Sequence, residues 1–235
     1  MKTESTKGTR MDRRHREVSR TMLLELCGVP PRVISLLKEE DFSLDGPLLN
    51  HLGESVYLWG PPGSGKTVMA VRIMAGTMVK MKANLPSSRD EIVKALSSDL
   101  PKFAKEFRFV SLPLLYSNLR SLYSKLKTFD VIVLDDEYAE QQNIDPVDQI
   151  QKAKYVILDD LGAIRMTPWA YETTFQIIEY RYNWVLPTVF TSNFSLKELA
   201  ERLSNDKIPT RISEMCKDHI VHITKSESQF LQDFE

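Results

Sequence analysis

The sequence has little cysteine, no long apolar run and no signal-like start. Its 235 residues include 2 cysteines, Cys27 and Cys216, which are isolated and make no metal-ligand spacing. No apolar run approaches the roughly 18 residues that a membrane-spanning helix needs, and the charged N-terminus lacks the apolar core of a secretion signal. We therefore expect a cytoplasmic protein with reduced cysteines and no association with a membrane.

The sequence also lacks an excess of either charge. Its 31 lysines and arginines nearly balance 32 aspartates and glutamates, so the formal net charge is −1. Without a global positive field, any nucleic-acid site must be a local basic patch. Hydrophobic residues make up 42% of the chain and charged residues 27%, which fits one globular domain with at most a short appendage.

Residues 55–70, SVYLWGPPGSGKTVMA, are the most informative segment. An apolar run leads into a loop with the spacing Gly, four residues, Gly, Lys, Thr, and a helical pattern begins directly after it. An ordinary turn rich in glycine and proline is the alternative, but such turns rarely stand between a strand and a helix with this spacing. The predicted phosphate-binding residues are Gly60, Pro61, Pro62, Gly63, Ser64, Gly65, Lys66 and Thr67.

This loop predicts a site for a nucleoside triphosphate and Mg²⁺. Glycines allow a tight turn whose backbone N–H groups face the phosphates, with the positive end of the next helix behind them. Lys66 is expected to reach the β- and γ-phosphates, and the Thr67 hydroxyl is expected to ligate Mg²⁺.

Two acidic strand ends compete for the other half of the metal site. Apolar residues 131–134 end at Asp135-Asp136, and residues 155–158 end at Asp159-Asp160. Ligands of open α/β sheets bind at the carboxyl ends of the strands, where one carboxylate would hold Mg²⁺ and the next would orient the attacking water. We favour Asp159 and Asp160, because the segments after them complete a recognisable unit; Asp135-Asp136 would then be a solvated strand end in an insertion.

The remaining chain alternates between strand and helix patterns. Further strands are expected at residues 107–110, 187–191 and 220–223, and helices within 68–78, 114–126, 168–182, 195–203 and 209–216. This alternation predicts a doubly wound parallel sheet. Asn193 follows a strand and could contact the γ-phosphate or simply make a turn. The basic residues 1–20 fit either a frayed terminus or an arm that docks on a partner.

Several motifs in one order resemble the bacterial and phage helicase-loader ATPases, the DnaC/IstB-like AAA+ proteins. They are LWGPPGSGKT, YVILDDLGA, FQIIEYRYNWVLPTVFTSN, SLKELAERL and RISEMC, preceded by CGVPPRVISLLKEEDF. The resemblance covers roughly residues 27–223 and implies an α/β P-loop NTPase fold of the AAA+ class. Residues 1–45 would form a short helical N-terminal extension that could bind a partner, and residues 46–235 the ATPase domain.

The resemblance also implies roles for particular residues. Asp159 and Asp160 match the Walker B pair, with Asp159 at the metal and Asp160 at the water. Asn193 matches the sensor 1 residue. Arg211 matches the arginine finger, which would enter the site of a neighbouring subunit and stabilise transition-state charge there. ATP and Mg²⁺ are the implied cofactors.

Three features depart from the family pattern. Most AAA+ proteins have Glu where this chain has Asp160, which is shorter by one methylene. Residues 129–150 form a longer insertion than expected, and the tail KSESQFLQDFE lacks the arginine of a sensor 2 contact.

The function implied by the resemblance is ATP-dependent loading of a replicative DNA helicase onto single-stranded DNA by a nucleotide-dependent oligomer. An IstB-like transposition helper that remodels DNA for a transposase is the alternative with the same core. A small-molecule P-loop kinase and a non-hydrolysing, ATP-gated adaptor are further alternatives. Arg120, Lys125 and Lys127 are candidates for DNA contact, although a solvated helix face explains them equally well.

Overall fold

The computed structural model describes residues 21–37, 49–80, 105–128 and 145–224, with the backbone alone for residues 49, 79 and 123–128. Several sequence predictions lie outside the described residues. They are the basic arm 1–20, the strand 131–134 with Asp135-Asp136, and the tail after residue 224.

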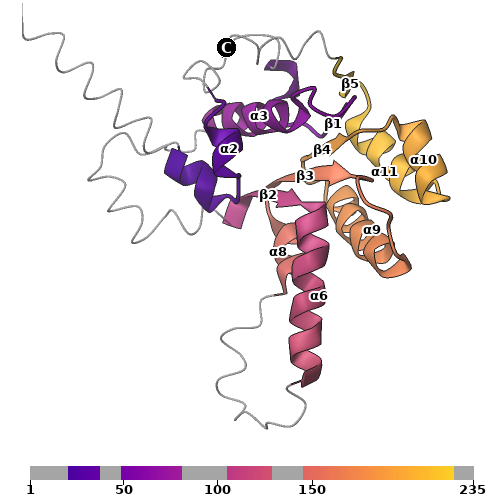
Figure 1. Ribbon diagram of the computed structural model, residues 1–235. Helices are drawn as coiled ribbons and strands as arrows, with labels where there is room; N and C mark the ends of the chain where they lie inside the picture. Colours follow the sequence, from indigo (N-terminus) through magenta and orange to yellow (C-terminus); the bar gives the residue numbers. More distant parts are fainter. Residues whose placement is uncertain (1–20, 38–48, 81–104, 129–144, 225–235) are drawn as a thin grey trace, which may run out of the picture.

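One five-stranded parallel sheet organises the described residues (Figure 1). The strands run in the order β2-β3-β4-β1-β5, and every pairing between neighbours is parallel. Their bounds are β1 Val56–Trp59, β2 Phe107–Ser111, β3 Tyr155–Leu161, β4 Thr188–Ser192 and β5 Ile220–His222. Because consecutive strands are separated by crossovers, the structure confirms the doubly wound α/β fold predicted from the sequence.

Helices cover both faces of the sheet. The main helices are α3 Lys66–Lys80, α6 Leu112–Thr128, α8 Pro146–Lys152, α9 Pro168–Asn183, α10 Leu196–Leu203 and α11 Lys207–Cys216, with short turns at α2 Pro31–Ile34 and η2 Leu49–His51. α3 and residues 21–37 lie against one face, and α6, α8, α9, α10 and α11 lie against the other (Figure 1). The outer half of α6 projects away from the sheet.

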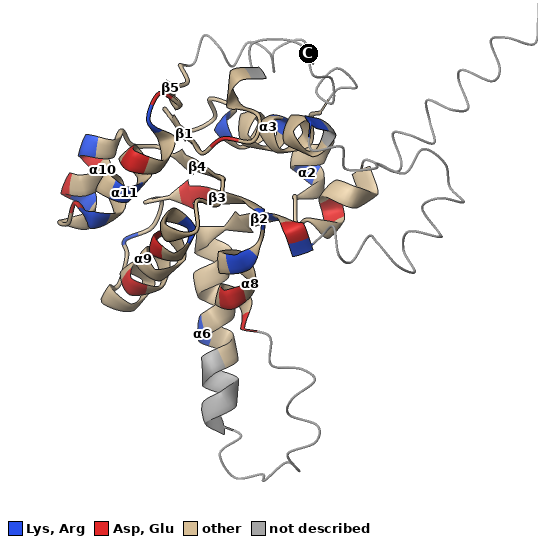
Figure 2. Ribbon diagram, turned by 180° about the vertical axis from the view of Figure 1, so that it is seen from behind, with Lys and Arg blue, Asp and Glu red and all other residues tan. Residues whose placement is uncertain are grey.

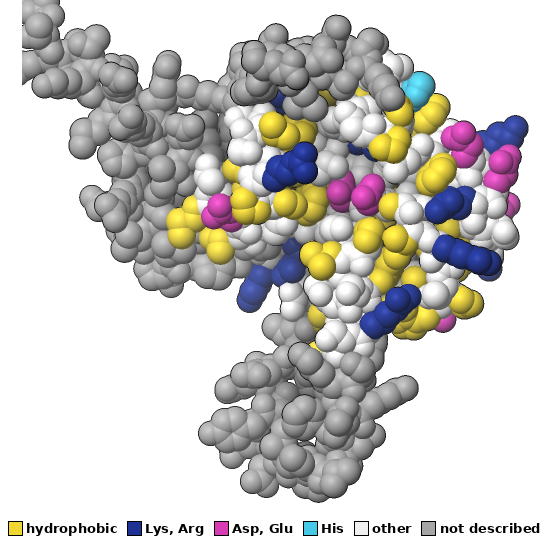
Figure 3. Space-filling model, in the orientation of Figure 1, with side chains coloured by type: hydrophobic (Ala, Val, Ile, Leu, Met, Phe, Trp, Pro, Cys, Tyr) yellow, Lys and Arg dark blue, Asp and Glu magenta, His cyan; other side chains and the backbone are white. Residues whose placement is uncertain are grey.

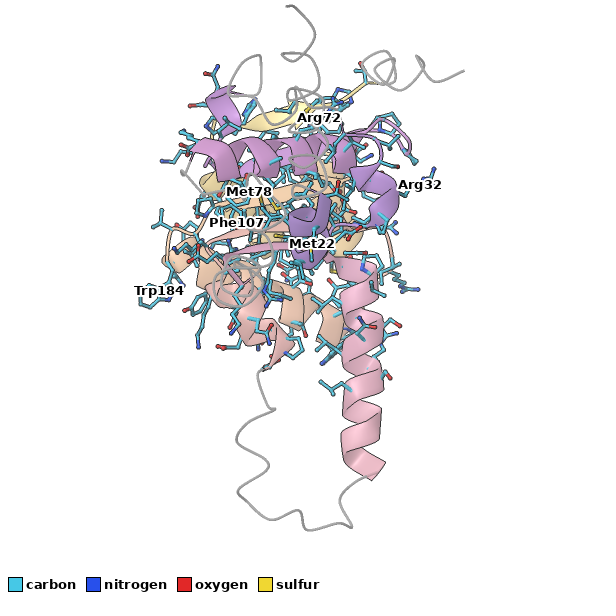
Figure 4. The ribbon with its side chains drawn as sticks, turned by 90° about the vertical axis from the view of Figure 1, so that its left-hand side faces the viewer. Met22, Arg32, Arg72, Met78, Phe107 and Trp184 are labelled. Carbon is cyan, nitrogen blue, oxygen red and sulfur yellow. The ribbon has the colours of Figure 1, made fainter. Side chains whose placement is uncertain are left out.

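Alternate strand residues build two separate cores. Val56 and Leu58 of β1 belong to the core under α3, whereas Tyr57 between them belongs to the core on the opposite face. Met78 on α3 and Phe107 on β2 are 1% and 2% exposed and lie close together in the interior (Figure 4). Successive side chains of a strand therefore point into the cores on opposite faces of the sheet, as expected for a sheet that is buried on both sides.

Side-chain caps fix where several helices begin. The predicted capping box at the start of α10 is present, with Ser195 and Glu198 bonded reciprocally to each other's backbone N–H groups. Helix α8 was not predicted, because Asp145 and Pro146 fall within the proposed insertion 129–150. The Asp145 side chain accepts a hydrogen bond from Val147 N at 2.9 Å, so an N-cap followed by proline starts this helix.

A buried arginine connects α8, α9 and β4. Arg181 on α9 is 0% exposed. Its guanidinium donates to the carbonyls of Ile150, Gln151, Ala153 and Pro187 and to Thr188 Oγ1. Burial lowers the pKa of Arg181 to about 9, and these acceptors satisfy its donors without a carboxylate.

The described part of the N-terminal segment packs with β1 and α3. Leu23, Leu24 and Cys27 are buried in the same cluster as β1 and α3. The predicted boundary between residues 45 and 46 lies outside the described residues and stays a prediction. Among the described helices, none has the length and hydropathy required to cross a membrane.

Candidate functional site

The glycine-rich loop joins the carboxyl end of β1 to the first turn of α3, as predicted. Gly60 has φ 154° and Gly65 has φ 86°. A Cβ on Gly60 would lie 2.1 Å from the carbonyl oxygen of Ile223, so only glycine fits where the loop passes the residue after β5. The close approach explains the first glycine, and the positive φ explains the last.

The Lys66 ammonium lies within the loop. Its Nζ donates to Gly60 O at 2.9 Å and to Pro61 O at 2.8 Å, and the residue is 7% exposed. Burial lowers the pKa of Lys66, while the charges of Asp160 and Asp159 oppose that shift. The carbonyls of the glycine-rich loop therefore hold the Lys66 ammonium at the base of the turn.

Thr67, Asp159 and Thr191 form a chain of hydrogen bonds across three elements. Thr67 Oγ1 on α3 donates to Asp159 Oδ1 at 2.9 Å, and Thr191 Oγ1 on β4 donates to the same oxygen at 2.7 Å. Asp159 is 8% exposed. Burial raises its pKa, and the hydrogen bonds from Thr191 and Thr67 act in the opposite direction. The two residues predicted at the metal site, Thr67 and Asp159, are therefore in direct contact, and their role in metal binding stays a prediction.

Asp160 occupies a bulge at the end of β3. Leu158 pairs with Phe190 and Leu161 pairs with Ser192, so β3 has one more residue than β4 in this interval. Within this bulge, Asp160 has φ 67°. This is a left-handed conformation that Asp tolerates better than most residues. Figure 2 shows the acidic residues of this strand end in red.

Asn193 and Arg211 occupy different surroundings. Asn193 directly follows β4, and Ser192 O before it accepts from Gly60 N at 3.2 Å, so Asn193 stands beside the phosphate loop. Arg211 lies on α11, where its Nε donates to Glu179 Oε2 at 2.7 Å and its Nη1 to Glu214 Oε2 at 3.2 Å. The structure thus gathers the loop, both aspartates and Asn193 at one sheet edge, and engages Arg211 with α9.

The donor set at this edge fits Mg²⁺ bound together with phosphates. Mg²⁺ in nucleotide sites usually has one or two protein ligands and completes its shell with phosphate oxygens and water. Thr67 and Asp159 supply a hydroxyl and a carboxylate, and the described residues contain no cluster of three or more His, Cys, Asp or Glu that would suit another metal. Figure 3 shows acidic side chains near the middle of this face among mainly apolar and uncharged atoms.

The candidate DNA contacts on α6 are described only in part. Arg120 is exposed, and its guanidinium carbon lies 5.9 Å from the centre of the Trp169 ring. The side chains of Lys125 and Lys127 lie outside the described residues, so the proposed basic face stays a prediction.

Sequence reasoning missed Thr191 and Ser192. Ser192 Oγ donates to Leu161 O at 2.7 Å, and Asp160 N donates to Thr191 Oγ1 at 2.9 Å. Two consecutive hydroxyl residues at the end of the strand were the available signal. The pairing of β4 with β3 was needed to show what they bind.

No protein-family model matches the chain, and no curated protein matches it either. Among solved structures, it is similar to a DnaC helicase loader, with a TM-score of 0.46 and 23% identity over 73% of this chain and 78% of that chain. It is also similar to DnaI, with a TM-score of 0.42 and 24% identity over 73% and 69% of the two chains. A third match is a protein described as a primosome component from Streptococcus pyogenes serotype M3, with a TM-score of 0.44 and 18% identity over 83% and 88%. These are distant likenesses, and the properties of the site follow from its own contacts.

Proposed function

We propose that this protein binds and hydrolyses ATP and uses the cycle to load a replicative DNA helicase onto single-stranded DNA. The hydrogen bond between Thr67 Oγ1 and Asp159 Oδ1, 2.9 Å long, carries the ATPase part of the proposal. It joins the end of the phosphate loop to the first acidic residue of β3. A turn rich in glycine and proline without a nucleotide role has no need of this pairing.

Each residue at this edge has a role in the proposed reaction. The loop N–H groups and Lys66 bind the phosphates, and Thr67 and Asp159 hold Mg²⁺, which would neutralise charge on the phosphate oxygens. Asp160 orients the attacking water, and Asn193 contacts that water or the γ-phosphate. Arg211 acts on the nucleotide of a neighbouring copy in an oligomer.

The helicase partner is supported by the sequence resemblance to helicase loaders, which extends over several motifs in one order. Solved structures of a DnaC helicase loader and of DnaI have similar chains, although the likeness is too distant to support a shared partner. Partner identity therefore depends on a direct experiment.

A nucleotide-binding assay tests the enzymatic part. Lys66→Ala is expected to weaken ATP binding and abolish hydrolysis, because it removes the charge that faces the β- and γ-phosphates. Lys154→Ala is a matched control, since Lys154 is exposed and forms a surface ion pair with Glu106 at 2.8 Å. Hydrolysis at the wild-type rate by the Lys66 variant would show that the phosphate-loop assignment is wrong.

Affinity purification from the native host with the protein held in its ATP-bound form tests the partner. Recovery of a replicative helicase, lost in the Lys66→Ala variant, supports the loader. Recovery of a transposase instead would support the IstB-like alternative. Recovery of neither, with ATP turnover intact, would contradict both assignments.

A further inference from the structure

Thr191 is the buried residue that joins the two aspartates at the end of β3. Its hydroxyl donates to Asp159 Oδ1 at 2.7 Å and accepts from Asp160 N at 2.9 Å. The residue is 1% exposed, so water cannot easily replace either bond. Both hydrogen-bonding capacities of the hydroxyl are thus directed at the two acidic residues.

The bond to Asp160 N has a specific structural cause. The bulge in β3 interrupts the regular ladder between Leu158 and Leu161, so an N–H in this interval has no ladder partner of the usual kind. The Thr191 hydroxyl takes the place of that partner and holds the backbone that carries the Asp160 carboxylate. Neighbouring Ser192 binds Leu161 O and fixes the other end of the bulge.

The bond to Asp159 Oδ1 orients a carboxylate whose negative charge is disfavoured by burial. Thr67 and Thr191 donate to the same oxygen from opposite elements, α3 and β4. With both donors present, the Asp159 side chain has one orientation relative to the phosphate loop. With Thr67 alone, the carboxylate would lose the anchor on the strand side and could rotate about its bond to Cβ.

We propose that Thr191 is a positioning residue that sets the geometry of Asp159 as a metal ligand and of the Asp160 backbone. This inference rests on the proposed nucleotide and Mg²⁺ site, and it assigns part of that site's metal affinity to a hydroxyl that contacts neither the metal nor the nucleotide. Groups that orient metal ligands typically contribute 10–100-fold to metal affinity or activity.

Hydroxyl removal on the full chain tests the proposal. Thr191→Val keeps the shape and removes both hydrogen bonds, whereas Thr191→Ser keeps the hydroxyl. Thr188→Val is the matched control, because Thr188 lies at the opposite end of β4 and is 0% exposed. Its hydroxyl binds Arg181 and Leu186, away from the aspartates, so its loss lowers stability without touching the metal ligands.

Two quantities are measured for each variant: Mn²⁺ affinity by electron paramagnetic resonance in the presence of a non-hydrolysable ATP analogue, and affinity for that analogue in EDTA. Thr191→Val is expected to lose ~10–100-fold in metal affinity and to keep its metal-free nucleotide affinity. Thr191→Ser and Thr188→Val are expected to bind Mn²⁺ as the wild type does.

Each other outcome has a distinct meaning. If the wild type binds no nucleotide, the proposed function fails and takes this inference with it. If the wild type binds the metal–nucleotide pair and Thr191→Val binds Mn²⁺ equally well, the inference alone is wrong. An equal loss in Thr188→Val would also overturn it, since the effect would then be general destabilisation. Thr191→Ala replaces Thr191→Val if the latter does not fold, and failure of both to fold would assign Thr191 to stability alone.

Discussion

The hydroxyl of Thr67 donates a 2.9 Å hydrogen bond to Asp159 Oδ1. This contact links two segments that are 92 residues apart in sequence, one from the phosphate loop and one from the acidic strand. A buried carboxylate in this position is held by neutral donors, since Lys66 directs its ammonium to the loop carbonyls. The negative charge that would suit Asp159 to bind a metal ion is therefore the charge that burial makes unfavourable for folding.

Asp159→Asn is expected to stabilise the nucleotide-free protein while it removes Mg²⁺-dependent turnover. Burial raises the pKa of Asp159 above its ordinary value, so ionisation of this group favours the unfolded chain. The contribution of Asp159 to the free energy of unfolding is complete below the unfolded pKa of about 3.9. It is lost as the pH rises through the folded pKa. At pH 7, Asn avoids the charge and keeps an acceptor, so we expect a gain of ~0.5–2 kcal/mol in the free energy of unfolding.

Urea denaturation at several pH values measures this gain, which should shrink as the pH falls toward 4. Asp135→Asn is the matched control for turnover, because Asp135-Asp136 was the competing acidic pair. The Asp135 variant is expected to keep most of its activity. Loss of Mg²⁺-dependent turnover in the Asp135 variant alone would reverse the assignment of the metal site.

Asp160→Asn is expected to bind ATP and to hydrolyse it slowly. The substitution keeps the left-handed bulge, since Asn also tolerates a positive φ, and removes the carboxylate that would orient water. We expect a loss of ~10²–10⁴ in the rate of the chemical step, measured by single-turnover hydrolysis beside an equilibrium nucleotide-binding assay. Hydrolysis by this variant at the wild-type rate would instead show that Asp160 has no part in catalysis.

The sequence predicted those features that local spacing controls. The strand, loop and helix around Lys66 follow from one contiguous motif. The preference for Asp159 over Asp135 rests on the segments after Asp159 and stays a prediction. Thr191 could not be recognised, because its role depends on the register between β3 and β4. Arg181 was equally hidden, since its acceptors come from α8 and from the start of β4. In both cases, contacts between distant segments define the role.

Val185→Gly is expected to stabilise the protein. Val185 follows α9 with φ 51° and is 85% exposed, next to Trp184, which points away from the molecule (Figure 4). Its N–H bonds Tyr182 O at 3.1 Å, and Leu186 N bonds Arg181 O at 2.9 Å, which is the helix ending where glycine is usual. A β-branched residue in this conformation is strained.

Removal of that strain should raise the free energy of unfolding by about 0.5–1 kcal/mol, after allowance for the greater freedom of glycine in the unfolded chain. Urea denaturation measures the change, and Val185→Ala should give a smaller gain because alanine keeps a Cβ. A lower stability for Val185→Gly would mean that the Val185 side chain makes a stabilising contribution larger than its strain.

Arg211 is expected to act on the nucleotide of a second copy. Its guanidinium cannot deprotonate at neutral pH and can donate two bonds to phosphate oxygens. In the single chain, it is held by Glu179 at 2.7 Å and lies 4.7 Å from the centre of the Tyr182 ring. The side chains of Arg211 and Glu179 are 32% and 30% exposed, and ion pairs that solvent reaches contribute little to stability. Arg211→Ala should therefore fold and keep its ATP affinity.

The same variant should lose turnover, because arginine fingers supplied by a neighbour contribute ~10³–10⁵ in well-studied NTPases, and we expect a smaller factor here. Inactive Arg211→Ala protein mixed with inactive Lys66→Ala protein should regain activity, since some interfaces then combine an intact loop with an intact Arg211. Glu179→Gln serves as the control, because it breaks the same ion pair and keeps the arginine, and it should retain turnover. Absence of rescue in the mixture, together with turnover per chain that does not rise with protein concentration, would contradict the loader and the transposition helper alike, because both require a site completed by a second copy.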